Sequence, residues 1–173
     1  MAMTLIERID VTSNSNVAYT FSAIPQTYTD LLLVTTMFGV GSGIEGPFIR
    51  INGITTNTYS YNMLRRNSTQ GNDGGYTAPN AFTAPAVYSY GQTNYPNFAG
   101  SGWVYFPNYT NTNIIRAWNS FAGASSNDNT TSSAQNIITG QTSQTTAAMT
   151  SLTISGYGLA IATGTTLSLY GIS

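Results

Sequence analysis

The chain has 173 residues, of which five are arginine and six are acidic, and it contains no histidine, cysteine or lysine. Most nucleophilic, acid–base and metal chemistry near neutral pH lacks its usual side chains here, which predicts a protein that is not an enzyme and holds no metal or cofactor. Only 6% of the residues are charged and the net charge is −1. This excludes nucleic acid and anionic membranes as expected partners, because both are bound through many Lys and Arg contacts.

The same composition predicts that the chain works within an assembly. A net charge near zero removes the repulsion that keeps soluble monomers apart. The apolar content of 41% is enough for the core of one domain, so residues 1–173 are expected to fold as a single unit. The lack of cysteine fits folding in a reducing cytoplasm, and residues 1–8 lack the basic and apolar regions of a signal peptide.

Short runs of period-two alternation begin near the N-terminus and predict strands instead of helices. The first covers 5–11, with Leu5, Ile9 and Val11 expected on one face, and a second covers 17–21. The segment 28–37 is apolar on both faces through its centre, which predicts a central strand that is covered on both sides.

The middle of the chain is expected to alternate strands with loops. After a glycine-rich loop at 38–46, a strand at 48–51 ends at Asn52-Gly53, the strongest short signal for a hairpin, so the return strand would be 58–64. The turn-rich segment 67–80 predicts a long surface loop. Further strands are expected at 86–90, 102–106, 113–121, 151–155 and 165–172, and polar loops at 122–135 and 141–146.

About nine or ten short strands without helical crossovers predict an all-β fold, an antiparallel two-sheet β-sandwich of jelly-roll type. Alternation also predicts which rings share a face. Trp103 and Tyr105 are expected side by side on one face of their strand. On the next strand, Ala117 and Phe121 are expected on the face opposite Trp118, together with Ile115.

Carboxylates are the only candidates for acid–base chemistry, and a glycoside hydrolase needs two of them about 5–9.5 Å apart. Sequence spacing does not exclude such a pair, but ordinary structural roles explain these residues. Asp30 is expected to cap the start of a strand, Asp73 and Asp128 to lie in turns, and Glu7 to pair with Arg8 or Arg50. The six carboxylates are Glu7, Asp10, Asp30, Glu45, Asp73 and Asp128.

Two glycine-rich stretches superficially suggest ligand loops. Residues 39–43 lack the lysine of a phosphate loop, and no helix is expected to follow them. Residues 72–75 are rich in oxygen ligands but lack the spacing and the terminal glutamate of a calcium loop. Both are interpreted as ordinary loops.

The aromatic content is the strongest signal for binding, since twelve tyrosines and two tryptophans are present. Such rings bury area while their hydroxyl and NH groups reach polar partners, which suits interfaces and also stacking on sugars. Core packing is expected for Tyr19 and for at least one of Trp103 and Trp118. Arginines add donors for a partner's carboxylates or carbonyls. The interface candidates are Tyr59, Tyr61, Arg65, Arg66, Tyr88, Tyr90, Trp103, Tyr105, Arg116 and Trp118.

Four stretches carry a resemblance to a known group of proteins: FSAIPQTYTDL at 21–31, RING at 50–53, WVYFPNY at 103–109 and LSLYGI at 167–172. In them the chain resembles structural proteins of tailed bacteriophages, small β-sandwich proteins found as head decoration proteins and as tail-fibre tips. The resemblance covers most of the length. It implies a virion component, commonly a homotrimer, that docks on a larger protein shell with its loops outward, and it carries over no active site.

The combined expectation is a capsid decoration, or cement, protein on the surface of the phage head, made in the host cytoplasm. Its partners would be further copies of itself and the major capsid protein of the shell. The alternative is a tail-fibre or receptor-binding module that recognises host surface glycans through the Asn- and Gly-rich segments 67–80 and 122–136. A carbohydrate-active enzyme that uses two of the six carboxylates ranks third.

Overall fold

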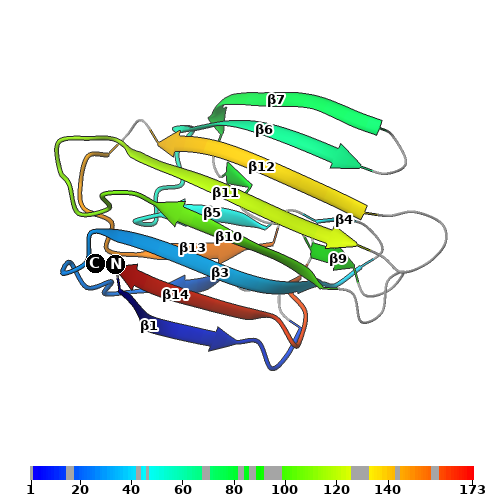
Figure 1. Ribbon diagram of the computed structural model, residues 1–173, viewed down its shortest axis with the longest axis horizontal. Helices are drawn as coiled ribbons and strands as arrows, with labels where there is room; N and C mark the ends of the chain where they lie inside the picture. The colour runs from blue at the N-terminus through cyan, green and yellow to red at the C-terminus, as the bar shows by residue number, and fades with distance from the viewer. Residues whose placement is uncertain are drawn as a thin grey trace.

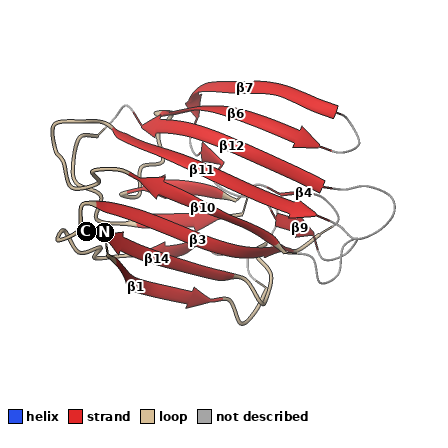
Figure 2. Ribbon diagram, viewed as in Figure 1, coloured by secondary structure: helices blue, strands red, loops and turns tan. Residues whose placement is uncertain are grey.

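The structure is a computed structural model that describes residues 2–14, 18–41, 44–45, 47–67, 71–81, 84–85, 89–91, 99–125, 133–142, 145–156 and 160–173. Every regular element within these ranges is a β-strand (Figure 2). In the same ranges no helix is long and apolar enough to span a membrane. The all-β prediction is confirmed, although the alternation pattern underestimated the number of strands.

A large antiparallel sheet forms one layer of the molecule (Figure 1). Its strands follow the order β1 (Met3–Asp10), β14 (Thr166–Ile172), β3 (Asp30–Gly39), β10 (Gly100–Phe106), β11 (Arg116–Ser125), β12 (Ser133–Thr142), β6 (Tyr59–Asn67) and β7 (Gly71–Ala81). Two short strands extend it at the end of β3, where β9 (Ser89–Gly91) pairs in parallel with β3 and antiparallel with β4 (Ile44–Glu45).

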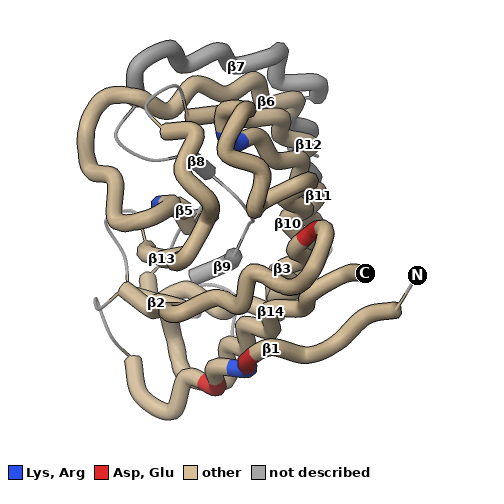
Figure 3. Tube along the Cα trace, turned by 90° about the vertical axis from the view of Figure 1, so that its left-hand side faces the viewer, with Lys and Arg blue, Asp and Glu red and all other residues tan. Residues whose placement is uncertain are grey.

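A smaller sheet forms the second layer, in the order β2 (Tyr19–Phe21), β13 (Leu152–Ser155), β5 (Phe48–Ile51) and β8 (Ala84–Pro85). Figure 1 looks onto the large sheet with the small sheet behind it, and Figure 3 shows the two layers side by side. The outer face of the large sheet is therefore the face turned towards the viewer in Figure 1.

The strand pairing is nested, as the jelly-roll-like prediction requires. β1 pairs with β14 in the large sheet, whereas β2 pairs with β13 in the small sheet. The next pairs follow the same scheme, since β3 lies beside β14 and β5 beside β13. The chain thus passes from one layer to the other and back, which confirms an antiparallel two-sheet sandwich of jelly-roll-like topology.

The core lies between the two sheets and is built by period-two alternation on both inner faces. The large sheet contributes Leu31, Leu33 and Met37 from β3 and Trp118 and Ala122 from β11. The small sheet contributes the inward residues Phe21, Ile49, Ile51, Leu152 and Ile154. Most of the side chains that both sheets bury against each other are apolar, so the hydrophobic effect holds the layers together.

The prediction for β3 is half right. The strand is central, because it lies between β14 and β10, and Leu31 and Leu33 are buried. The expected cover on the other side is wrong, since Val34 is exposed and Leu32 is only half-buried. Apolar residues on both faces of this strand therefore do not mean burial on both faces.

The Asn52-Gly53 turn forms, but the predicted hairpin is wrong. Both residues have positive φ, 51° and 67°, as the turn requires. The Asn52 side chain fixes the turn by accepting hydrogen bonds from the backbone N–H groups of Thr150 and Ser151, at 2.8 and 3.1 Å. The strand that follows is β6, which pairs with β12 and β7 in the other sheet.

Three segments expected to be loops contain strands. β4 lies inside the predicted loop 38–46, and β12 begins at Ser133, inside the predicted loop 122–135. Residues 71–81 form β7 at the edge of the large sheet, so Asp73 lies in a strand and not in the predicted turn. Their polar, Gly- and Asn-rich sequences conceal the strands because the backbone of a neighbouring strand supplies the pairing. Residues 86–88 and 126–132, and with them Asp128, lie outside the described residues.

β1 departs from the predicted face because of a bulge. Its register against β14 shifts between Leu5 and Glu7, so Leu5 faces outward and is exposed whereas Ile9 packs against the core. The predicted ion pair of Glu7 with Arg8 or Arg50 is also replaced. The Arg8 guanidinium lies 2.8 Å from the Asp10 carboxylate instead.

Candidate interaction face

The outer face of the large sheet carries one apolar side chain on each of five neighbouring strands, aligned in register. Val34 pairs with Trp103 and Trp103 with Phe121. Phe121 pairs with Ile137 and Ile137 with Leu64. We call this row, which crosses the strands, the apolar stripe. Its exposed fractions are 39% for Val34, 41% for Trp103, 39% for Phe121, 53% for Ile137 and 58% for Leu64.

The stripe accounts for most of the large apolar side chains that the described part of the chain exposes. Two others, Met3 and Leu5, lie on β1 and face the same side. The remaining two, Ile114 and Ile115, lie in the loop before β11. Single exposed apolar residues are normal, but a contiguous row of five is a feature of contact surfaces.

A row of mostly polar side chains runs beside the stripe on the same face. Tyr105, Asn119, Thr139 and Asn62 are paired across β10, β11, β12 and β6. The Thr139 hydroxyl donates a hydrogen bond to Asn119 Oδ1 at 3.2 Å. Along these strands an apolar line therefore borders a line of hydroxyl and amide groups, the composition of a hydrophobic contact with a polar rim.

Among the side chains that the structure describes, charge is nearly lacking from this face. On the strands from β3 to β6, the charged side chain that the structure places there is Asp30, at the first residue of β3. Its carboxylate accepts hydrogen bonds from the Tyr105 hydroxyl at 2.7 Å and from the Asn108 N–H at 2.8 Å. The bond to Asp30 raises the pKa of Tyr105. Asp30 thus serves the fold, as predicted for a residue at a strand entry.

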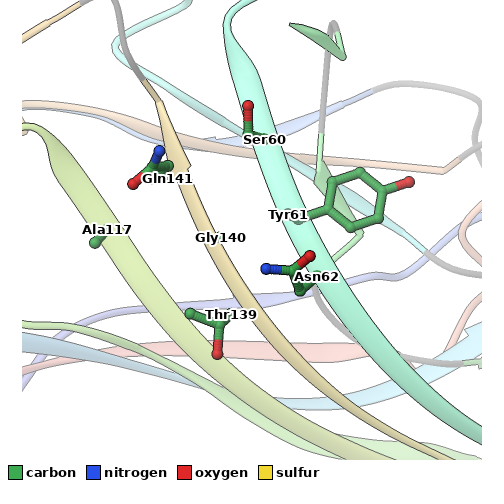
Figure 4. A pocket seen from close by; sticks show the side chains of 7 residues that line it. All are labelled: Ser60, Tyr61, Asn62, Ala117, Thr139, Gly140 and Gln141. Atoms are coloured by element: carbon green, nitrogen blue, oxygen red, sulfur yellow. The ribbon is translucent and has the colours of Figure 1, made fainter. Parts of the chain in front are cut away.

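Two hollows lie on the face. One, of about 400 Å³, is open and mainly apolar and is lined by Leu32, Trp103, Tyr105, Asn119 and Ile172. The other, of about 240 Å³, lies over Gly140 and is lined by Ser60, Asn62, Ala117, Thr139 and Gln141, with the backbone of Tyr61 (Figure 4). Figure 4 shows the Tyr61 ring pointing away from Gln141 and Thr139.

The outer face of the small sheet differs sharply. Thr20, Thr153 and Arg50 are paired across β2, β13 and β5, and the Thr20 and Thr153 hydroxyls are hydrogen-bonded at 2.9 Å. That row contains the hydroxyl and guanidinium groups expected of a sheet that faces water. The apolar row on the large sheet is therefore a property of one face and not of the whole molecule.

Of the ten predicted interface residues, Trp103 and Tyr105 lie on this face. Trp103 belongs to the stripe, and Tyr105 is half-buried beside it. The prediction that these two side chains share a face of their strand is confirmed. The predicted placement of Phe121 opposite Trp118 is confirmed as well, since Phe121 is exposed and Trp118 is fully buried.

Three predicted interface residues are structural, which corrects the prediction. Tyr59 and Trp118 are fully buried and pack edge to face, with ring centroids 6.2 Å apart. Arg116 is 3% exposed, and its guanidinium donates to the carbonyls of Asn108, Asn111 and Thr146, so it ties two loops together. Burial lowers the pKa of Arg116. None of these three groups offers surface to a partner.

Of the other candidates, one packs against the core and the rest have side chains that the structure does not describe. Tyr61 is half-buried and packs against the core, as does Tyr19, for which core packing was predicted. The side chains of Arg65, Arg66 and Tyr90 and the whole of Tyr88 lie outside the described residues.

Sequence reasoning missed four of the five stripe residues as contact candidates: Val34, Phe121, Ile137 and Leu64. Each is an outward residue of its strand, so alternation alone could have placed it. The signal that joins them is the register between strands far apart in sequence, and this exists only in the folded sheet.

Within the described residues, no three acidic side chains come together as a metal site would need. No protein-family model, curated protein or solved structure matches the chain. The resemblance to phage structural proteins therefore stays a prediction from the sequence.

Proposed function

We propose that this chain is a building block of a larger protein assembly, namely a decoration (cement) protein of a bacteriophage head that acts by binding and not by catalysis. The apolar stripe carries the proposal. Five aligned apolar side chains that face water are unfavourable for a free monomer, and contact with another protein surface removes that cost. The phage head is the setting that the sequence resemblance implies.

The distribution of polar groups supports the same function. A cement protein must hold neighbouring subunits by area and shape, and an apolar line bordered by hydroxyl and amide groups suits that task. The low charge of the chain, 6% of its residues, leaves little repulsion between copies packed closely on a shell. Chemistry on a substrate is not needed for this role.

Heads prepared with and without the protein test the proposal directly. The decorated heads should release their DNA at a higher temperature than bare heads, and adding the purified chain to bare heads should restore the difference. A variant with Thr at Phe121 and Ile137 should restore it poorly, whereas Ile115→Thr, off the stripe, should restore it fully. Equal release temperatures for bare and decorated heads would refute the cement role.

The hollow over Gly140 favours a second candidate, a receptor-binding module of a tail fibre that recognises host glycans. Ser60, Asn62, Thr139 and Gln141 present hydroxyl and amide groups there, which can bond sugar hydroxyls. Trp103 and Phe121 lie on the same face and offer rings for stacking. Binding to a glycan array that is lost in Gln141→Ala, with adsorption to host cells blocked by the free chain, would favour this function over the first.

A further inference from the structure

We propose that the apolar stripe is the contact between two copies of this chain, which pair outer face to outer face about a two-fold axis that runs along β11. This deepens the proposed function and rests on it, since it names the first partner in the assembly. The inference concerns the face alone and does not depend on the head as the final location.

The stripe is self-complementary because it is centred on β11. Phe121 lies at its middle, with two apolar residues on each side along the sheet. An in-plane two-fold axis along β11 brings Phe121 onto Phe121 of the second copy and Trp103 onto Ile137. An isologous contact of this kind needs one patch that matches itself, and a straight row across the strands meets that requirement.

Relief on the face agrees with the same axis. The apolar hollow lies on the β3 and β10 side, beside Trp103. The two most exposed stripe residues, Ile137 and Leu64, lie on β12 and β6. The two-fold axis places these strands opposite β10 and β3 of the second copy. Rotation about β11 therefore sets Ile137 of each copy over Trp103, which forms one wall of the hollow, and sets Thr139 and Asn62 over Tyr105 and Leu32.

The area of the face suffices for a stable pair. The five strands from β3 to β6, which lie symmetrically about β11, are spaced by about 4.8 Å, and about seven residues along each, at about 3.3 Å, give a flat face of roughly 550 Å² before the relief of side chains is added. A standard interface buries about 800 Å² on each partner. The stripe supplies the apolar centre of such an interface, and the row from Tyr105 to Asn62 supplies a polar rim.

Charge on the described side chains does not oppose the pairing. A face that meets a copy of itself places like charges together, but Asp30 is held by hydrogen bonds at the strand end, and Arg8 is paired with Asp10 on β1. The strands that carry the stripe contribute no other described charged side chain to the face. Sheet faces that contact water usually carry charged residues, and like charges would then meet across a contact between two identical faces.

The edges of the large sheet favour pairing by the face over pairing by the edge. β1 carries a bulge between Leu5 and Glu7, and the β6–β7 pairing is irregular at two places. β7 also contains Pro79, which has no N–H to donate. Bulges and proline at the edge strands are the usual devices against edge-to-edge association.

Sedimentation equilibrium on the full chain tests the inference. A dimer of the 18.4 kDa chain is expected at low micromolar concentration. Ile137→Thr, which keeps a β-branched residue, should raise the dissociation constant by at least about thirtyfold, the loss typical of a hot-spot side chain. Ile115→Thr is the matched control, because Ile115 is 38% exposed but lies off the sheet, and it should leave the constant unchanged.

A cross-linking experiment tests the axis and remains decisive if a substitution weakens folding. The chain has no cysteine, so Asn119→Cys, on β11 beside the stripe, introduces a single thiol and leaves all five stripe residues in place. A bismaleimide about 10 Å long, the spacing of packed sheets, should couple two Asn119→Cys chains and leave Ile115→Cys chains uncoupled. Failure of Asn119→Cys to couple, or equal coupling of both variants, would overturn the inference.

The two proposals fail separately. A wild-type chain that stays monomeric to about 100 µM, or forms the trimer that the sequence resemblance implies, overturns the two-fold pairing even if the chain stabilises heads. A dimer that dissociates on Ile137→Thr, but neither binds nor stabilises heads, leaves the pairing intact and refutes the cement role.

Discussion

The hydroxyl of Tyr59 should contribute measurably to stability, because it bonds the two sheets inside the core. It accepts a hydrogen bond from the Ile51 N–H at 2.9 Å, and it lies 3.3 Å from the Ile54 carbonyl, to which it can donate. Tyr59 is on β6 of the large sheet, Ile51 ends β5 of the small sheet, and both are fully buried. Tyr59→Phe removes the oxygen and keeps the ring against Trp118.

The magnitude follows from the group that is left behind. Without the hydroxyl, the Ile51 N–H is buried and loses its partner, which costs about 1–3 kcal/mol. We expect a loss of about 2 kcal/mol in the free energy of unfolding, and for a chain of this length that lowers the Tm by about 4–8 °C. Urea and thermal unfolding, followed by far-UV circular dichroism, measure both quantities.

Tyr105→Phe is the matched control. Its hydroxyl bonds Asp30, but at a half-exposed site where water can replace the bond, so the expected loss is below about 1 kcal/mol. If Tyr59→Phe unfolds at the same urea concentration as the wild type, the hydroxyl does not join the sheets. If Tyr59→Phe keeps full stability and loses association, Tyr59 is an interface residue after all.

Three further predictions concern the core and the Asn52-Gly53 turn. Gly140→Ala would place a Cβ against the Trp118 ring, closer than van der Waals contact, so it should cost about 3 kcal/mol and weaken the near-UV circular dichroism of tryptophan. Full stability of this variant would disprove the close packing. Asn52→Ala removes the acceptor of two backbone N–H groups and should lower the free energy of unfolding in urea by about 2 kcal/mol. Gly53→Ala strains only the positive φ of residue 53 and should lower it by about 1 kcal/mol. Burial raises the pKa of Tyr59 above the ordinary tyrosine value, so the folded state holds that proton longer, and the stabilisation present below about pH 10 is lost as the pH rises further. Tyr59→Phe should flatten this alkaline decline in the free energy of unfolding, and an unchanged slope would contradict it.

What could be predicted from the sequence is what depends on neighbouring residues. Alternation placed Trp103 and Tyr105 on one face, and it separated Phe121 from Trp118, because successive side chains of a strand point to opposite sides. The positive φ of Asn52 and Gly53 was readable for the same reason, since a two-residue turn is a local structure.

What could not be predicted depends on partners far along the chain. β12 and β7 are poor in β-formers, and they are strands because β11 and β6 offer them backbone groups to bond. The return from Asn52 crosses to the other sheet because Ser151 and Thr150, nearly a hundred residues later, hold the turn. The apolar stripe is a third case, because it exists only when five separate strands adopt one register.

Folding alone does not require the stripe to be apolar, so a polar substitution in the stripe can separate a role in contact from a role in folding. The small sheet presents Thr20 and Thr153 outward and forms nevertheless, so β-branched hydroxyl residues satisfy the strand as well as aliphatic ones. Ile137→Thr should therefore change the free energy of unfolding of the dilute chain by no more than about 0.5 kcal/mol, the range of ordinary surface substitutions. The same variant should remove any dependence of the Tm on protein concentration, because only association links the two. If Ile137→Thr lowers the free energy of unfolding by more than about 1.5 kcal/mol at low protein concentration, Ile137 supports the fold of a single chain. That result would contradict the stripe as a contact surface.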